Sequence, residues 1–212
     1  MKYNITIICT SHNQNGKCNS LELLSIIEEY NPEIIFEEIS KTVFDQCYGL
    51  MNRNTLETSA IKMYLSQKEI IHMPVVGAEL SDDLDKKLEV LTKNSNYRNL
   101  VDRFMLLENR YGFSFLNSKE CCELFDKMNE IEKLIMIELN DEKFNSVIQL
   151  SDANVNNYEN EIISNVYEYS KQNKYDKALL FIGAAHKQSI AQKLKEYDKL
   201  ENFKLNWSFF KG

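Results

Sequence analysis

The first forty residues contain the pattern that most limits how this chain can fold. A short apolar run over residues 5–10 ends at Ser11 and His12. An amphipathic stretch follows, and after Pro32 a second apolar run, residues 33–39, carries two glutamates near its end. Short runs that are apolar nearly throughout are typical of strands covered on both faces of a parallel sheet. The pattern therefore predicts a strand, a loop, a helix and a second strand parallel to the first.

The amphipathic stretch is expected to be a helix packed on this sheet. Its N-cap is predicted at Asn19 or Ser20, because these side chains accept hydrogen bonds from the free amides of a first helical turn. Apolar residues then recur at the spacing of one helical face, and they are Leu23, Ile26, Ile27 and Tyr30. Pro32 prevents the helix from continuing. The second strand therefore begins directly after this proline.

A further helix and strand follow this unit. Residues 56–64 carry apolar side chains at helical spacing, and residues 75–79 predict a third strand that ends at Glu79. Pro74 is expected just before that strand, because proline lacks the amide hydrogen that a central strand needs. The preceding loop contains His72, which matches no motif and is expected to be structural or solvent-exposed.

Strand signals return near the end of the chain. Residues 178–183 are apolar, and His186 comes shortly after them. A short amphipathic helix follows, and residues 203–209 then alternate strictly between apolar and polar positions. Such alternation is typical of an edge strand with one face in water. Between the third and fourth strands, residues 82–173 show four helical patterns and no convincing strand.

These elements together predict one α/β domain that spans residues 1–212. We expect a mostly parallel sheet covered by helices, with a C-terminal edge strand. Residues 82–173 are expected to form a largely helical insertion in this domain. A chain of 212 residues is long enough to bury the core of one such domain.

Composition narrows the classes of function. The net charge of −7, without any cluster of lysine or arginine, argues against nucleic acid as the main partner. No apolar run approaches the ~20 residues that a transmembrane helix needs, and the N-terminus lacks the features of a signal peptide. The five cysteines show no C-x-x-C spacing, which favours reduced thiols. We therefore expect a cytoplasmic protein without a membrane span.

A histidine or a glutamate accompanies the end of each of the four predicted parallel strands. His12 follows the first strand, Glu38 and Glu79 end the second and third, and His186 follows the fourth. In open α/β sheets, ligands bind outside the carboxyl ends of the strands. We therefore expect these four side chains to line one site. Glu37 is adjacent to Glu38, so in a regular strand it points to the opposite face and only one of the two can reach that site.

This set of side chains suits two kinds of chemistry. Two imidazoles and a carboxylate can bind a divalent metal ion and leave positions open for water or substrate. Without a metal, a histidine beside a carboxylate can act as a general base toward water. Each residue also has a structural alternative, since a histidine after a strand can cap a helix and Glu79 can be an acidic residue at a helix N-terminus. The residues alone leave these alternatives open.

Three segments resemble the signatures of the TraB/PrgY and Tiki family. Residues 10–12 read Thr-Ser-His, where the family has G-T-x-H, and residues 32–39 read P-E-I-I-F-E-E-I, where it has P-D-x-V-x-x-E-L. Residues 181–190, F-I-G-A-A-H-K-Q-S-I, are similar to an apolar strand that leads into G-x-x-H and then G-I. Cys9 and Ser189 stand where that family has glycine. The wider superfamily includes erythromycin-esterase-like proteins and ChaN-like haem-binding proteins.

The resemblance implies a hydrolytic site. Its register selects Glu38 rather than Glu37 and implies His12, Glu38 and His186 as catalytic residues. In the Tiki branch the activity is attributed to a metal ion, which here would be held by His12, Glu38, Glu79 and His186. In the esterase branch a histidine acts directly on water.

The sequence thus predicts a hydrolase with a histidine–glutamate site at the C-terminal edge of the sheet, with or without a divalent metal ion. One alternative is a haem- or metal-binding protein of the ChaN-like type without turnover. Another is a non-catalytic interaction protein that uses the helical insertion as its partner surface. A family arginine before the fourth helical pattern has no clear counterpart, although Tyr158 and Asn160 lie nearby. No motif indicates the substrate.

Overall fold

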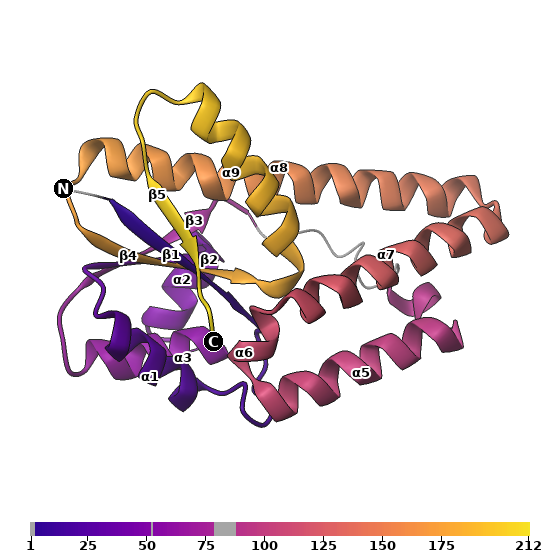
Figure 1. Ribbon diagram of the computed structural model, residues 1–212, viewed down its shortest axis with the longest axis horizontal. Coiled ribbons are helices and arrows are strands. Elements are labelled where there is room, and N and C mark those ends of the chain that lie inside the picture. The colour runs from indigo at the N-terminus through magenta and orange to yellow at the C-terminus, as the bar shows by residue number, and fades with distance from the viewer. Residues whose placement is uncertain (1–2, 52, 79–87) are drawn as a thin grey trace.

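The protein is an α/β sandwich built on five parallel strands (Figure 1). The computed structural model describes residues 3–51, 53–78 and 88–212. The strands are β1 (Asn4–Thr10), β2 (Ile34–Ser40), β3 (Ile71–Val76), β4 (Lys177–Gly183) and β5 (Asn206–Phe209), and their order in the sheet is β3-β2-β4-β1-β5. This arrangement confirms the predicted fold class, including the C-terminal edge strand.

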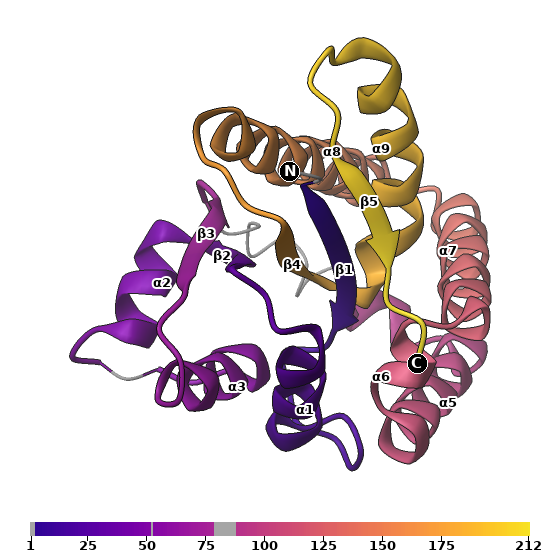
Figure 2. The same cartoon turned by 60° about the vertical axis from the view of Figure 1, so that its left-hand side comes forward.

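Helices cover both faces of the sheet. They are α1 (Ser20–Tyr30), α2 (Lys41–Tyr48), α3 (Leu56–Leu65), α5 (Ser95–Tyr111), α6 (Phe113–Leu116), α7 (Lys119–Leu139), α8 (Glu142–Gln172) and α9 (Lys187–Leu200), together with a single 3-10 turn, η1 (Ala184–His186). Figure 2 shows α1 and α3 on one side of the sheet and α8 and α9 on the other. The predicted N-cap of α1 is Asn19, whose side chain accepts hydrogen bonds from the amides of Leu21 and Glu22.

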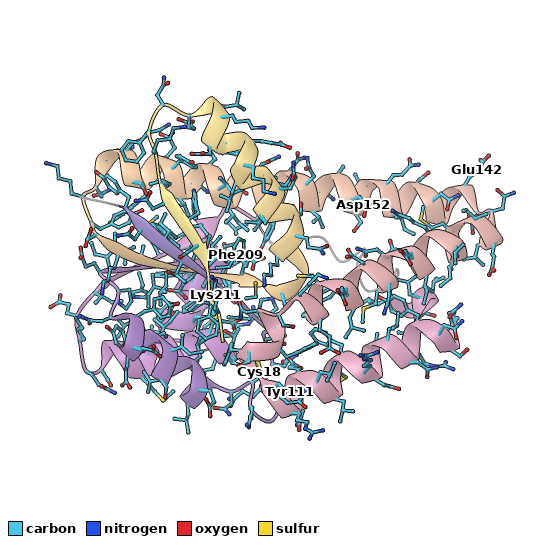
Figure 3. The ribbon with its side chains drawn as sticks, viewed as in Figure 1. Cys18, Tyr111, Glu142, Asp152, Phe209 and Lys211 are labelled. Atoms are coloured by element: carbon cyan, nitrogen blue, oxygen red, sulfur yellow. The ribbon has the colours of Figure 1, made fainter. Side chains whose placement is uncertain are left out.

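The described residues between β3 and β4 are mostly helical, and α5, α7 and α8 extend beyond the carboxyl edge of the sheet as a long arm (Figure 1). Glu142 lies at the tip of this arm, and Asp152 lies between the tip and the sheet (Figure 3). No helix in the described part of the chain is both long enough and apolar enough to cross a membrane.

Strand β4 lies between β1 and β2, although it comes more than a hundred residues later in the chain. On one side Ile182 pairs with Cys9, and on the other Leu180 pairs with Phe36. The first two strands are parallel, as the sequence predicts, but they are not neighbours. The residues that follow β4 therefore emerge between the ends of β1 and β2.

The third strand differs from its prediction. Strand β3 begins at Ile71 rather than at Val75, so His72 lies in a strand and not in a loop. The predicted end of this strand, Glu79, lies outside the described residues. Pro74 lies inside this strand, opposite Glu37 of β2. The sheet tolerates the proline because β3 is an edge strand, where a missing amide hydrogen need not break a ladder bond. Helix α2, which follows β2 directly, was not predicted either.

A buried amide side chain fixes the end of β1 that leads to His12. Strand β5 pairs only with the first half of β1, residues 4–7. Beyond it, Asn117 Oδ1 accepts a hydrogen bond from the Cys9 amide at 2.9 Å, and Asn117 Nδ2 donates to the Cys9 carbonyl at 3.0 Å. Asn117 Nδ2 also donates to the Phe113 carbonyl at 2.9 Å. The Asn117 side chain thus takes the place of a neighbouring strand at this point.

Candidate functional site

The ends of β1, β2 and β4 bring the predicted site residues to one edge of the sheet. His12 lies two residues after β1, Glu38 lies near the end of β2, and His186 ends the turn after β4. A small pocket is lined by Thr10, His12, Glu37, Glu38, Ile39, Glu57, Thr58 and Phe181. Inside it, the space open to a water-sized sphere is about 10 Å³.

His186 lies between two buried carboxylates. Its Nε2 is 3.3 Å from Glu38 Oε1, and its Nδ1 is 2.8 Å from Glu159 Oε1. The second oxygen of Glu38 accepts a hydrogen bond from the amide of Gly183, at the end of β4. Only 15% of the His186 side chain is exposed. The ring is therefore held in one orientation, with Nε2 facing Glu38.

The Glu38–His186 pair favours the retention of a proton. Burial alone would lower the pKa of His186, but the hydrogen bond with Glu159 and the charges of Glu38 and Glu159 outweigh burial and raise this pKa. Burial raises the pKa of Glu38, and the opposing effects of His186 and the Gly183 amide do not cancel it. Because two coupled groups titrate as a unit, both shifts mean that the pair binds a proton more readily than the free groups would. The pair can thus donate a hydrogen bond or a proton.

His12 is held by a second carboxylate, that of Glu57. His12 Nδ1 lies 3.4 Å from Glu57 Oε1, and the hydroxyl of Thr10 donates to the same oxygen at 2.8 Å. Glu57 lies in the first turn of α3, and the amide of Leu56 donates to the backbone carbonyl of His12 at 3.2 Å. The start of α3 therefore fixes both the backbone and the side chain of His12. In contrast to His186, the His12 side chain is 64% exposed.

Glu57 stays ionised although it is buried. Burial alone would raise the pKa of its carboxyl group, but the hydrogen bond and the charge of His12, the Glu57 backbone amide and the Thr10 hydroxyl lower this pKa overall. The two glutamates at the pocket are thus shifted in opposite directions, since the pKa of Glu38 is raised. Opposite shifts of this kind separate a basic partner from an acidic one.

We expect Glu57 to make folding stability depend on pH in the acidic range. Its folded-state pKa is lowered, so its contribution is fully present above the pKa of an unfolded glutamate, about 4.3, and is lost as the pH falls through the folded-state pKa. Urea unfolding of the wild type and of Glu57→Gln should therefore give a constant difference in unfolding free energy at neutral pH. That difference should shrink below about pH 5. A difference that grows on acidification would contradict this assignment.

Glu159 and Glu57 are the site residues that sequence reasoning missed. Glu159 lies on α8 and is 2% exposed, and its second oxygen accepts a hydrogen bond from the hydroxyl of Ser189. Lys193 Nζ lies 3.8 Å from the same oxygen. Both glutamates occupy positions on the apolar face of their helix, which is the signal that could have identified them. Tyr158, beside Glu159, places its ring 5.7 Å from the His186 ring, centroid to centroid.

Glu37 makes a separate pair on the other side of β2. Its Oε1 lies 2.8 Å from His72 Nδ1, and its Oε2 accepts a hydrogen bond from the hydroxyl of Tyr48 at 2.6 Å. The rings of Tyr48 and Phe44 pack against His72. Glu37 and Glu38 thus engage different histidines, as the alternation of side chains along a strand requires.

The structure describes three of the four residues of the predicted metal site. Among residues 3–51, 53–78 and 88–212, no group of three or more histidine, cysteine, aspartate or glutamate side chains is arranged to hold a metal ion. Both ring nitrogens of His186 instead contact carboxylates, those of Glu38 and Glu159. Glu79, the fourth predicted ligand, lies outside the described residues. A site formed by His12, Glu38, Glu79 and His186 therefore stays a prediction.

Comparison with known proteins gives no match. No family model matches the chain, and neither does any curated protein or solved structure. The resemblance to the TraB/PrgY and Tiki family thus rests on the sequence motifs alone.

Proposed function

We propose that this chain is a hydrolase of acyl bonds such as esters, with its active site at the pocket between His12 and Glu38. The observation that carries the proposal is the meeting of two histidine–glutamate pairs at one sheet edge, His12 with Glu57 and His186 with Glu38. One histidine is exposed and the other is mostly buried. The pairs thus suit different roles in proton transfer. The motif resemblance to the TraB/Tiki and erythromycin-esterase-like superfamily supports the same class of reaction.

In this proposal His12 is the general base. A proton on Nδ1 that is shared with Glu57 leaves Nε2 as the basic nitrogen. Nε2 then accepts a proton from water while the water oxygen forms a bond to the acyl carbon. A carboxylate behind the imidazole fixes the tautomer and stabilises the imidazolium that forms, as in other histidine–carboxylate sites. The proton returns from His12 to the leaving group when the bond between the acyl carbon and that group breaks.

His186 and Glu38 supply the acidic side of the site. Because this pair retains a proton, Glu38, which lines the pocket, would donate a hydrogen bond to the carbonyl oxygen on which negative charge develops, once that oxygen replaces His186 Nε2 as its partner. Glu159 holds the imidazole from behind at 2.8 Å.

The charge of the pocket favours a neutral scissile group. The described residues that line the pocket include no lysine or arginine, and they include Glu38 and Glu57, whose carboxylates lie beside His186 and His12. A phosphate or carboxylate group at the reacting centre would meet like charge without a cationic partner.

The proposal is tested with the purified protein and a panel of neutral chromogenic esters that differ in acyl length. We expect turnover by the wild type, and a loss of about a hundredfold in kcat/KM for Glu38→Gln. His72→Gln is the matched control, because it alters another partly buried histidine–glutamate pair that the mechanism does not use. Equal activity of wild type and Glu38→Gln would overturn the proposal. Activity that survives EDTA supports direct action of histidine on water, whereas its loss and recovery with a divalent ion favour the metal-dependent route.

A further inference from the structure

A second recess lies at the opposite end of the sheet from the candidate site. It has a volume of about 330 Å³ and lies where β1 and β4 begin and α1 ends. Its lining includes Asn4, Thr6, Glu29, Tyr30 and Lys177. Sites for small molecules usually enclose about 300–1,000 Å³, so this recess has the size of a site for a small ligand.

The sheet face beneath the recess is largely polar, although β1 and β4 are central strands. Paired residues of parallel strands point to the same face. On the face toward α1, the paired segments of β1, β4 and β5 carry Asn4, Thr6, Lys177, Leu179, Asn206 and Ser208. On the other face, the same segments carry Ile5, Ile7, Ala178, Leu180, Trp207 and Phe209. A parallel sheet is normally apolar on both faces, so the polar side chains here suit a polar ligand better than a covering helix.

The polar groups of the recess are only partly satisfied by one another. Thr6 Oγ1 lies 3.0 Å from Ser208 Oγ. Burial and the charge of Glu29 raise the pKa of Tyr30, so its hydroxyl keeps its proton, and Thr6 lies within hydrogen-bond reach of it. Neither Glu29 nor Lys177 forms an ion pair with a residue that the structure describes. One carboxylate, on α1, and one ammonium group, on β4, are thus available to a ligand.

We propose that this recess binds a small α-amino acid with an apolar side chain. The carboxylate of Glu29 pairs with the ammonium group of the ligand, and the ammonium group of Lys177 pairs with its carboxylate. The hydroxyl of Tyr30 offers a further hydrogen bond, and its ring offers apolar surface to the ligand side chain. A ligand with a single charge would leave Glu29 or Lys177 without a partner, which is the basis of selectivity for a zwitterion.

This site is separate from the proposed active site, and the inference does not rest on the proposed hydrolysis. His12 and His186 follow the carboxyl ends of β1 and β4, whereas the recess lies at the amino ends of the same strands. A ligand in the recess is therefore out of reach of both histidines and is not the substrate of the proposed reaction.

Titration of isotope-labelled protein with leucine, followed by NMR, tests the site. We expect saturable changes in the amide signals of residues 4–6, 29–31 and 177–179. Leucinamide lacks the carboxylate and N-acetylleucine lacks the ammonium group, so each should bind about tenfold more weakly than leucine. Equal affinity for the three compounds would overturn the inference, and so would changes centred on residues 10–12 or 183–186. Alanine and phenylalanine cover smaller and larger side chains, and the absence of saturation with all three amino acids would overturn it as well.

Two charge substitutions at exposed positions assign the contacts. In Lys177→Gln, leucine should bind about tenfold more weakly while the affinity for leucinamide stays unchanged, because leucinamide has no carboxylate to lose a partner. In Glu29→Gln, the same loss is expected for leucine but not for N-acetylleucine. Lys174→Gln and Glu28→Gln are the matched controls, since they remove exposed charges nearby that do not line the recess. Controls that weaken leucine binding as much as the recess variants would show a general attraction by surface charge and overturn the inference.

Discussion

Replacement of His12 by alanine should lower kcat/KM for ester hydrolysis by about a thousandfold, within the range of about 10²–10⁴ that general bases contribute. The reason is that His12 is the exposed imidazole of the site and has Glu57 behind its Nδ1. Loss of the imidazole leaves Glu57 as the nearest base, and the lowered pKa of that carboxyl group makes it a weak one. Initial rates with a neutral chromogenic ester measure the effect.

Added imidazole distinguishes a lost base from a damaged fold. The His12 side chain is 64% exposed, so the space left in His12→Ala is open to solvent and free imidazole can enter it. We expect a rate that rises with imidazole concentration in this variant. His186→Gln should lose activity to a similar degree but show no rescue, because His186 is 15% exposed and glutamine fills most of its space. Rescue of both variants, or of neither, would contradict the assignment of His12 as the base.

Asn117→Ala should destabilise the protein by about 3 kcal/mol. The change removes both hydrogen bonds to the backbone of Cys9 and one to the carbonyl of Phe113. Cys9 is fully buried, so its amide and carbonyl would stay without partners away from water. For a chain of this size the melting temperature should fall by roughly 6–12 °C. Urea unfolding followed by circular dichroism gives the free energy of unfolding.

Asn165→Ala is the matched control for this prediction. Asn165 Nδ2 makes one hydrogen bond, to the carbonyl of Val75 at 3.0 Å, in a partly buried position. Its loss should cost about 1 kcal/mol, as for a typical single hydrogen bond. Equal effects of the two substitutions would show that Asn117 does not support the backbone of β1 as described.

The strands next to the site could be predicted from the sequence because each is a nearly continuous apolar run. Residues 4–10, 34–40 and 177–183 are buried along most of their length, and the pattern of a strand covered on both faces needs no knowledge of its neighbours. His12 and His186 come shortly after such strands in the sequence. The direction of the strands therefore places both histidines at the carboxyl edge of the sheet. Their proximity to Glu38 could be predicted because parallel strands have their carboxyl ends at the same edge of the sheet.

Other features of the fold and the site depend on contacts between residues far apart in the chain, which a local sequence pattern does not show. The position of β4 between β1 and β2 depends on pairing between residues far apart in the chain. The sequence predicts that the third strand begins after Pro74, but the strand includes this proline because β3 is at the edge of the sheet. The two glutamates that orient the histidines, Glu57 and Glu159, are among 32 acidic residues, most of which have no role at the site. Their position on the buried face of a helix reduces the choice, but Glu108 and Glu132 are also buried on helices.

The position of β4 also has a consequence for synthesis of the protein on the ribosome. This central strand and His186 lie in the last quarter of the chain, so they emerge after β1, β2 and the helical arm have been made. Until then the neighbouring edges of β1 and β2 have no strand to pair with, and unpaired apolar edges promote association with other chains. The nascent chain therefore has to keep two strand edges apart and protected until residues 177–183 arrive. Insertion of that segment completes the sheet and the candidate site in the same step.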